Sequence, residues 1–175
     1  MTPKDSRHLI ALGISSAIVF AVFNLQILAK ERLREDGRLV LLELAPVDPR
    51  SLMQGDYMIL NYAISDQARE AAYDAAKDGD IPETVPFVAR LDADGVATFS
   101  RLGHTPPPGP DEVLMTARSI ERGWGVGAES FFFQEGQAEV FEDAKFGEVR
   151  ISESGALLLV GLRGADKQPL GPERW

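Results

Sequence analysis

Residues 84–102, TVPFVARLDADGVATFSRL, decide the fold class of this 175-residue chain. Two apolar-alternating runs, residues 84–92 and 96–102, flank the dipeptide Asp94-Gly95. An Asp-Gly pair between two such runs is a strong signal for a tight turn that joins antiparallel strands. The stretch therefore predicts a β-hairpin, and it favours an antiparallel β domain.

Further strand-like segments lie on both sides of this hairpin. They cover residues 39–45, 57–64, 112–120 and 130–136, and a second hairpin over 147–164 that turns at Glu153, Ser154 and Gly155. The proline-rich residues 103–111 predict a loop, and residues 122–129 predict a glycine-spaced turn. We therefore expect a mainly β fold (β with minor α), built mostly from antiparallel strands, with no internal repeat.

The minor helical content is predicted chiefly over residues 65–80. Ser65 or Asp66 can accept hydrogen bonds from the first-turn N–H groups, and Gly79 supplies a left-handed stop. A small-residue face suited to close packing on a sheet is formed by Ala68, Ala72, Ala75 and Ala76, with Tyr73 alongside. A second, short helix is expected over residues 138–146.

The N-terminal segment predicts a membrane-spanning helix. Residues 9–29, LIALGISSAIVFAVFNLQILA, contain no charged side chain. At about 1.5 Å per residue, a helix of this length spans roughly 30 Å, the hydrocarbon thickness of a bilayer. The run is longer than the apolar part of a cleaved signal peptide, and Ile27-Leu28-Ala29 is a poor cleavage site. We therefore expect a retained signal anchor.

This anchor organises the rest of the chain. We expect a short cytoplasmic N-terminus over 1–8, the transmembrane anchor over 9–29, a connector over 30–37 that is helical until it breaks at Gly37, and a soluble β-rich domain over 38–175. Lys and Arg are slightly more numerous on the C-terminal flank of the anchor than on its N-terminal flank. A single N-terminal anchor followed by a compact acidic domain nevertheless favours a domain outside the cytoplasm.

Charge and composition exclude several classes of function. Net charge is -9, with five Lys/Arg against three Asp/Glu over residues 1–35 and 13 against 24 over residues 36–175. A domain this acidic repels phosphate backbones, so no nucleic-acid partner is expected. The absence of cysteine excludes disulfides, thiolate zinc sites and cysteine nucleophiles.

The remaining residues predict no catalytic site, cofactor or metal. There is no Gly-x-Ser-x-Gly elbow, and the two histidines, His8 and His104, border the anchor and lie in the proline loop. A comparison with signal peptidases fails because Ser51 stands only four residues before Gly55. The turn at 92–96 places Val96 at a calcium-ligand position, which favours a plain hairpin.

A motif near the start of the domain resembles a known family. Gly55, Asp56, Tyr57, Leu60 and Tyr62 reproduce the pattern Gly-Asp-Tyr-x-x-Leu-x-Tyr, the signature of the bacterial GDYXXLXY proteins. The lead-in with Asp48-Pro49 and a second segment, residues 131–162 with Glu135-Gly136, are also similar to that family, so the likeness covers roughly residues 38–163. The resemblance implies a bacterial membrane-anchored protein. Together with the N-terminal anchor and the compact acidic domain, it leads us to expect the inner membrane, with the domain in the periplasm. Its relatives lie beside, or are fused to, polytopic membrane proteins, and the resemblance supplies no catalytic residues.

The motif also has a direct physical interpretation. Asp48-Pro49 bends the chain, Gly55 tolerates a positive φ, and Asp56 can accept hydrogen bonds from nearby backbone N–H groups. In the strand that follows, alternation places one set of side chains inward, namely Met58, Leu60, Tyr62 and Ile64. Asp56 or Glu135 is a candidate partner for a buried tyrosine hydroxyl. We therefore expect the motif to have a structural role.

Three functions remain open at this stage. The leading hypothesis is a non-enzymatic, membrane-anchored subunit that serves a polytopic membrane protein. The second is an anchored β-rich hydrolase with Asp56, Glu135 or Ser51 in its site. The third is a module that binds a small ligand or peptide through aromatic side chains, namely Trp124, Phe131, Phe132 and Phe133. The three phenylalanines fit either a docking surface or a strand buried on both faces. The sequence leaves open whether they lie beside the Gly-Asp-Tyr motif.

Overall fold

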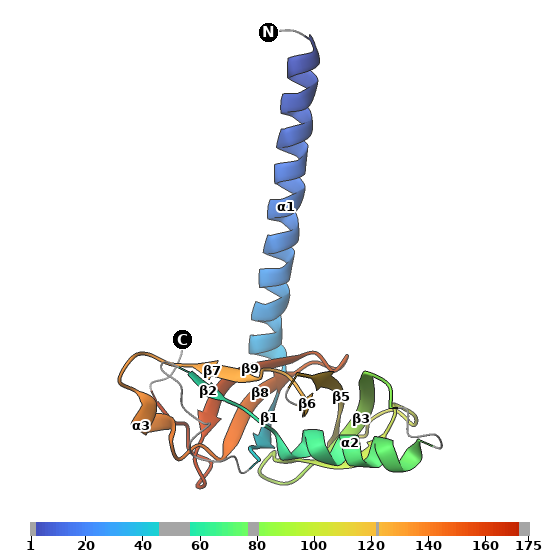
Figure 1. Ribbon diagram of the computed structural model, residues 1–175, viewed down its shortest axis with the longest axis vertical. Helices are drawn as coiled ribbons and strands as arrows, with labels where there is room; N and C mark the ends of the chain where they lie inside the picture. Colours follow the sequence, from blue (N-terminus) through green and yellow to red (C-terminus); the bar gives the residue numbers. More distant parts are fainter. Residues whose placement is uncertain (1–2, 46–56, 77–80, 122, 172–175) are drawn as a thin grey trace.

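A long helix stands on a β-rich domain in the computed structural model, which describes residues 3–45, 57–76, 81–121 and 123–171 (Figure 1). The helix, α1, runs from Pro3 to Asp36. The remaining elements are β1 (Arg38–Glu43), β2 (Tyr57–Ile59), α2 (Ala63–Ala75), β3 (Thr84–Leu91), β4 (Ala97–Leu102), β5 (Glu112–Ile120), β6 (Gly123–Gly125), β7 (Ser130–Phe132), α3 (Ala138–Phe141), β8 (Phe146–Ile151) and β9 (Leu157–Arg163). The domain is mostly antiparallel β, as the sequence predicts.

The strands form three antiparallel sheets. Their orders are β1-β8-β9, β2-β7 and β4-β3-β5-β6. The predicted hairpin over residues 84–102 is confirmed as β3 and β4, and Gly95 takes the required positive φ of 80° in its turn. The carboxylate of Asp92 accepts from the backbone N–H groups of Asp94 and Val96, each at 2.9 Å. That carboxylate therefore serves the hairpin turn.

A single core joins the three sheets, because each contributes its alternate residues to the same interior. Phe87 and Met115 come from the four-stranded sheet, Leu42 from the three-stranded sheet, and Met58 and Phe131 from the two-stranded one. At roughly 25 cal/mol per Å² of apolar surface, such burial is the main term that holds the domain together. Figure 1 shows α2 on the side of the domain farthest from α1, and β7 and β9 on the side nearest to it.

Helix α2 begins two residues earlier than predicted. Tyr62 occupies the N-cap position, and no side chain caps the first turn. The predicted cap by Ser65 or Asp66 is therefore wrong, since both lie inside the helix. Ser65 is 1% exposed, and its hydroxyl has no hydrogen-bond partner among the described residues. The helix faces the core with Ala68 and Ala72, whereas Ala75 is exposed. The predicted stop at Gly79 lies outside the described residues.

The predicted strand over 57–64 is shorter than expected. It ends at Ile59, and the chain changes partner shortly afterwards. Leu60 still donates to the carbonyl of Glu129, beside β7, whereas Ala45 donates to that of Asn61 and Leu44 bridges to Tyr62. The predicted inward alternation is nevertheless confirmed, since the four inward side chains are 2–3% exposed, namely Met58, Leu60, Tyr62 and Ile64.

Two further predictions need correction in the C-terminal half. The helix expected over 138–146 is only α3, Ala138–Phe141, because Phe146 already pairs with Glu43 in the three-stranded sheet. The glycine-spaced turn contains the short strand β6, whose Gly125 pairs with Arg118 of β5. The hairpin of β8 and β9 is confirmed.

The apolar part of α1 makes almost no contact with the domain. The stretch Leu12–Asp36 is long and apolar enough to cross a membrane. Phe20 and Leu25 are 70% and 66% exposed, so this stretch of the helix is not part of the core of the domain. The side-chain amide of Asn24, within this stretch, donates to the carbonyl of Phe20 at 2.8 Å. The chain therefore has one N-terminal helix suited to a single membrane crossing.

Candidate functional site

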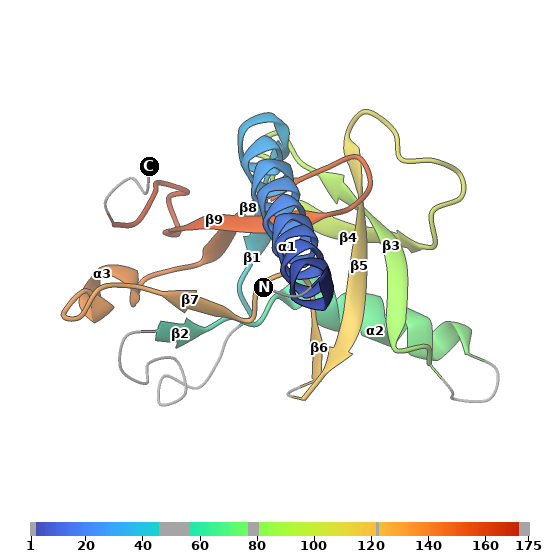
Figure 2. The same cartoon turned by 90° about the horizontal axis from the view of Figure 1, so that it is seen from above.

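The two segments that carry the sequence motif lie side by side. In the β2-β7 pair, Tyr57 is opposite Phe132, Met58 is opposite Phe131, and Ile59 is opposite Ser130 (Figures 1 and 2). The sequence left open whether the two segments are neighbours, because 70 or more residues separate the paired positions. The Gly-Asp-Tyr motif and the start of the second family segment, which contains Glu135-Gly136, therefore form one structural unit.

The inner face of this unit belongs to the core. Phe131 and Phe133 are 6% and 7% exposed, and both rings pack on Phe141, with centroid distances of 5.1 and 5.4 Å. The hypothesis that these two phenylalanines form a partner surface is thus not supported by their burial. Close aromatic pairs of this kind instead add stability to a core.

The outer face presents aromatic surface. Phe132 is 67% exposed, and its ring lies 5.6 Å from that of the half-buried Tyr57. The alternative of a strand buried on both faces is therefore wrong. Trp124 is half-buried and packs against the core from β6, which belongs to a different sheet.

The last two motif residues serve packing. Leu60 and Tyr62 are 3% and 2% exposed. The ring of Tyr62 lies against Gly147 of β8, where an added Cβ would stand only 2.8 Å from Cε1 of the tyrosine. Gly147 is thus a position where the small size of glycine admits the motif ring.

The hydroxyl of Tyr62 has no hydrogen-bond partner among the described residues. Burial raises the pKa of this phenol well above its usual value. Glu135, one of its two expected partners, lies on an exposed turn between β7 and α3, next to Gly136 with φ 82°. The other expected partner, Asp56, lies outside the described residues, as do Asp48, Pro49, Ser51 and Gly55.

The described residues bring together no set of side chains typical of a metal site. They contain no cluster of three or more His, Asp or Glu side chains that could hold a metal ion. His104 is exposed in the proline loop. Two part-buried carboxylates form ion pairs between strands, Glu112 with Arg101 at 2.7 Å and Glu148 with Arg163 at 2.8 Å.

A groove at the base of α1 is the feature that the sequence did not reveal. It has a volume of about 1140 Å³ and lies between the end of α1, the proline loop and the β8-β9 turn. Its polar and charged lining comes from α1 (Lys30, Arg32 and Asp36), β1 (Arg38), β5 (Glu112) and the turn (Ser152, Glu153 and Ser154). These segments are distant in the sequence, and the only sequence signal was the charged stretch that directly follows the apolar run.

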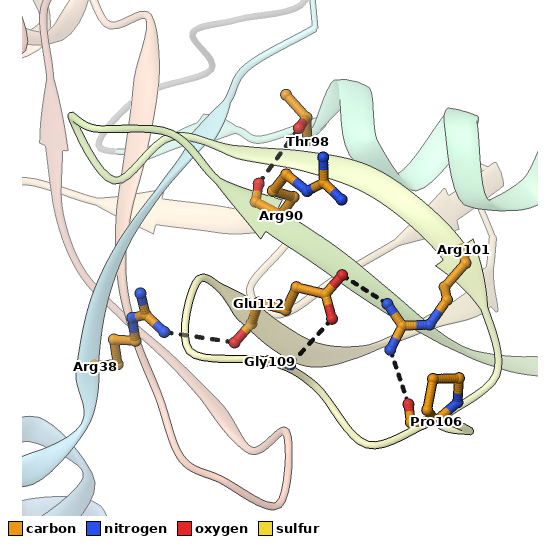
Figure 3. Close-up of polar contacts among 7 residues, drawn as sticks. All are labelled: Arg38, Arg90, Thr98, Arg101, Pro106, Gly109 and Glu112. Atoms are coloured by element: carbon orange, nitrogen blue, oxygen red, sulfur yellow. Dashed lines mark hydrogen bonds and ion pairs between the residues drawn. The ribbon is translucent and has the colours of Figure 1, made fainter.

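The proline loop forms one wall of the groove and is fixed by side chains (Figure 3). The carboxylate of Glu112 accepts from Arg101 at 2.7 Å and from the backbone N–H of Gly109 at 3.1 Å. Arg101 also donates to the carbonyl of Pro106 at 2.8 Å, and Arg38 donates to that of Pro110 at 2.5 Å. The hydrogen bond from Arg101 holds the pKa of Glu112 below its usual range.

The joint between helix and domain forms the floor of the groove. Only Gly37 separates α1 from β1, and its N–H donates to the carbonyl of Leu33 at 3.0 Å. Arg150 of β8 donates to the carbonyl of Gly37 at 2.9 Å. Leu33 is 8% exposed, and a Cβ on Gly37 would stand 2.2 Å from its carbonyl oxygen. The helix therefore enters the sheet directly, above β8 and β9 (Figure 2).

Comparisons with known proteins agree with the motif. A family model described as GDYXXLXY protein matches residues 19–162, more than four fifths of the chain, and confirms the family that the motif predicted. A search of curated proteins found no match, and a search of solved structures found none.

Proposed function

The chain belongs to the GDYXXLXY family, and we propose that it is a non-enzymatic accessory subunit of a polytopic membrane protein. In this proposal α1 anchors it in the bacterial inner membrane, and the β domain lies in the periplasm. The observation that carries the proposal is the joint at Gly37. Because one residue connects α1 to β1, a contact made by α1 within the bilayer and a contact made by the domain outside it are held in a fixed relation.

The use of the motif residues supports an interaction role over catalysis. Leu60 and Tyr62 build the core, and Glu135 lies on an exposed turn. The outer aromatic pair, Tyr57 and Phe132, offers apolar surface of the kind that protein interfaces favour. The anchored-hydrolase alternative names Asp56, Glu135 or Ser51; Glu135 is on the exposed turn, and the other two lie outside the described residues.

The exposed surface of α1 supports a partner inside the membrane. Its apolar side chains between Leu12 and Leu28 are exposed, so they are available to lipid or to another transmembrane helix. Small residues favour such helix contacts, and Gly13, Ser15, Ser16 and Ala17 lie within the span. A polytopic protein would supply the neighbouring helices.

Purification from the native host tests this proposal. The full chain, tagged at its C-terminus and extracted in mild detergent, is expected to recover one polytopic membrane protein in a fixed ratio. A reporter fused to the C-terminus, active only in the periplasm, checks the side of the membrane. Recovery of the chain alone under several detergents would contradict the accessory role, and an inactive periplasmic reporter would contradict the orientation.

A further inference from the structure

We propose that the groove at the base of α1 binds the headgroup of an acidic phospholipid from the surrounding bilayer, with Lys30 and Arg32 holding its phosphate. This inference rests on the membrane anchoring in the proposed function, but it does not require a protein partner. The occupant follows from the height of the groove, the charges on its lining and the fixed position of its walls.

The groove lies at the height of the lipid headgroups. Ala29, the last residue of the apolar run, belongs to its lining, and Asp36 at the end of α1 belongs to it as well. They are seven positions apart on the helix, which corresponds to roughly 10 Å along its axis. The polar layer on each side of a bilayer is about 5–8 Å thick. With the apolar run in the hydrocarbon, the groove therefore opens into the headgroup layer.

The basic residues at the end of α1 differ in whether they line the groove. Lys30 and Arg32 line the groove, together with Leu33, whereas Arg34 does not. The acidic residues Glu31 and Glu35 also lie off the groove. At 100° per residue, Lys30 and Arg32 project about 160° apart, so they reach the groove from two sides of the helix, and Asp36 is the acidic residue of α1 that lines the groove with them. A phosphate is the lipid group that the two cations would attract.

The balance of charge over the whole lining favours an anion. Three basic and three acidic side chains line the groove: Lys30, Arg32, Arg38, Asp36, Glu112 and Glu153. Glu112 is neutralised by Arg101 at 2.7 Å, so three cations face two unpaired acids. Although residues 36–175 carry a net charge of -11, those charges act weakly beyond a Debye length of about 8 Å, whereas the lining acts at contact distance.

The walls are in place before any lipid binds. Arg101 and Arg38 fix the proline loop on one side. On the other side, the hydroxyl of Ser152 accepts from the backbone N–H of Ala156 at 3.0 Å and lies 2.8 Å from that of Ser154. Preorganised walls reduce the entropic cost of binding. The apolar part of the lining suits the glycerol and upper acyl atoms, and it includes Leu33, Val113, Leu114, Ile151 and Ala156.

Native mass spectrometry of the full chain in detergent, with phosphatidylglycerol added, tests the charge contacts. We expect Arg32→Gln to lower the fraction with a bound lipid about fivefold, since each basic contact contributes about 1 kcal/mol. A Lys30→Gln/Arg32→Gln double variant should lose most of the signal. Arg34→Gln is the matched control, because it removes the same charge from the same helix outside the groove. Inorganic phosphate at the same concentration should not displace the lipid.

A second pair of variants tests the groove without altering charge. Ala156 is exposed and belongs to the lining, so Ala156→Trp should fill the groove and abolish lipid retention. Ala165→Trp, at an exposed turn position outside the lining, should retain it. Thermal melting confirms that each variant folds.

Three results would overturn the inference. An equal loss of bound lipid in Arg34→Gln and Arg32→Gln would mean that the basic end of the helix attracts lipid without a specific site. Retention of lipid by Ala156→Trp would show that the lipid does not bind in the groove. Absence of lipid in the wild-type chain, combined with cross-links from Ala156 to a protein in native membranes, would assign the groove to a protein segment. None of these measurements depends on recovering the polytopic partner.

Discussion

Tyr62 gives the motif a physical meaning at the scale of single residues. Its ring fills space that only a glycine at position 147 leaves open, so the motif residue and this distant glycine form one packing unit. The sequence identified Tyr62 as an inward residue from strand alternation alone. It did not identify Gly147, because nothing local distinguishes that glycine from a turn glycine.

Gly147→Ala is therefore expected to destabilise the domain. The new methyl group would lie 2.8 Å from the Tyr62 ring, and overpacking of this kind costs about 1–3 kcal/mol. Denaturant unfolding of the full chain in detergent measures the change in the free energy of unfolding. Gly161→Ala is the control, since its Cβ meets nothing closer than 3.6 Å. Equal stability of the two variants would refute the packing unit.

The Tyr62 hydroxyl predicts a response to alkaline pH. Because burial raises the pKa of the folded phenol above the unfolded value of about 10, the neutral form stabilises the fold below pH 10 and this contribution is lost as pH rises further. Tyr62→Phe keeps the ring and removes a hydroxyl that lacks a partner among the described residues, so its stability should match wild type at pH 8 and exceed it at pH 11.

Unfolding curves at these two values of pH provide the measurement. Tyr73→Phe is the control, because that side chain is 57% exposed. A large loss of stability in Tyr62→Phe at pH 8 would mean that the hydroxyl makes a hydrogen bond in the native protein.

At the scale of elements, the joint between α1 and β1 decides how the anchor holds the domain. Two hydrogen bonds hold this joint: the N–H of Gly37 donates to the carbonyl of Leu33, and Arg150 of β8 donates to the carbonyl of Gly37. The sequence predicted that a helical connector would break at Gly37, and α1 does end at Asp36. It could not predict the contact with Arg150, which lies 113 positions away.

Gly37→Ala is expected to weaken this joint. A Cβ there would stand 2.2 Å from the carbonyl oxygen of Leu33, so the helix end or the strand must shift, at a cost of about 1–3 kcal/mol. Gly109→Ala, whose Cβ meets nothing closer than 3.9 Å, is the control. Limited proteolysis should cut the Gly37→Ala variant near residue 37 faster than either the control or the wild type. Identical cleavage rates would show that the joint tolerates a side chain.

The ion pair of Glu112 governs the order of the proline loop. Its carboxylate joins Arg101 to the backbone of Gly109, so Glu112→Gln should speed amide exchange over residues 103–111 at pH 7. Since the pKa of folded Glu112 is lowered, the contribution of the charged form is present above the unfolded value of about 4.3 and is lost as pH falls through the folded value.

Hydrogen exchange followed by mass spectrometry at several values of pH measures this effect. The wild-type loop should approach the behaviour of the Glu112→Gln variant in acid. Glu153→Gln, at an exposed position on the opposite wall, provides the control. A loop that exchanges equally in both variants at pH 7 would be ordered by something other than this carboxylate.

The limits of sequence reasoning at this scale have clear causes. Alternation predicted the inward face of residues 57–64 correctly, because side-chain period follows from an extended backbone wherever it pairs. Alternation did not predict that the strand ends at Ile59, since the end of a strand depends on which neighbouring segment is available for backbone pairing. The prediction of a cap at Ser65 was wrong because the helix already begins after Tyr62, which occupies the N-cap position. The groove could not be predicted from the sequence, because its walls come from segments that only the tertiary fold brings together.

At the scale of the whole molecule, a continuous path leads from the bilayer to the motif strands. α1 leaves the membrane, joins the three-stranded sheet through Gly37, and that sheet shares its core with the β2-β7 pair. A partner that binds α1 would therefore act on a domain that cannot turn freely beneath it. This arrangement suits a subunit that holds a fixed orientation beside a larger membrane protein.

Photo-cross-linking along α1 in native membranes tests the accessory role most directly. A photoreactive residue is placed at Phe20, Leu25 and other exposed positions between Leu12 and Leu28, one at a time, in the full chain in its own host. The account predicts that positions on one side of the helix yield a discrete adduct with a single polytopic membrane protein, while the opposite side yields only lipid. Adducts with lipid alone at every position would contradict it.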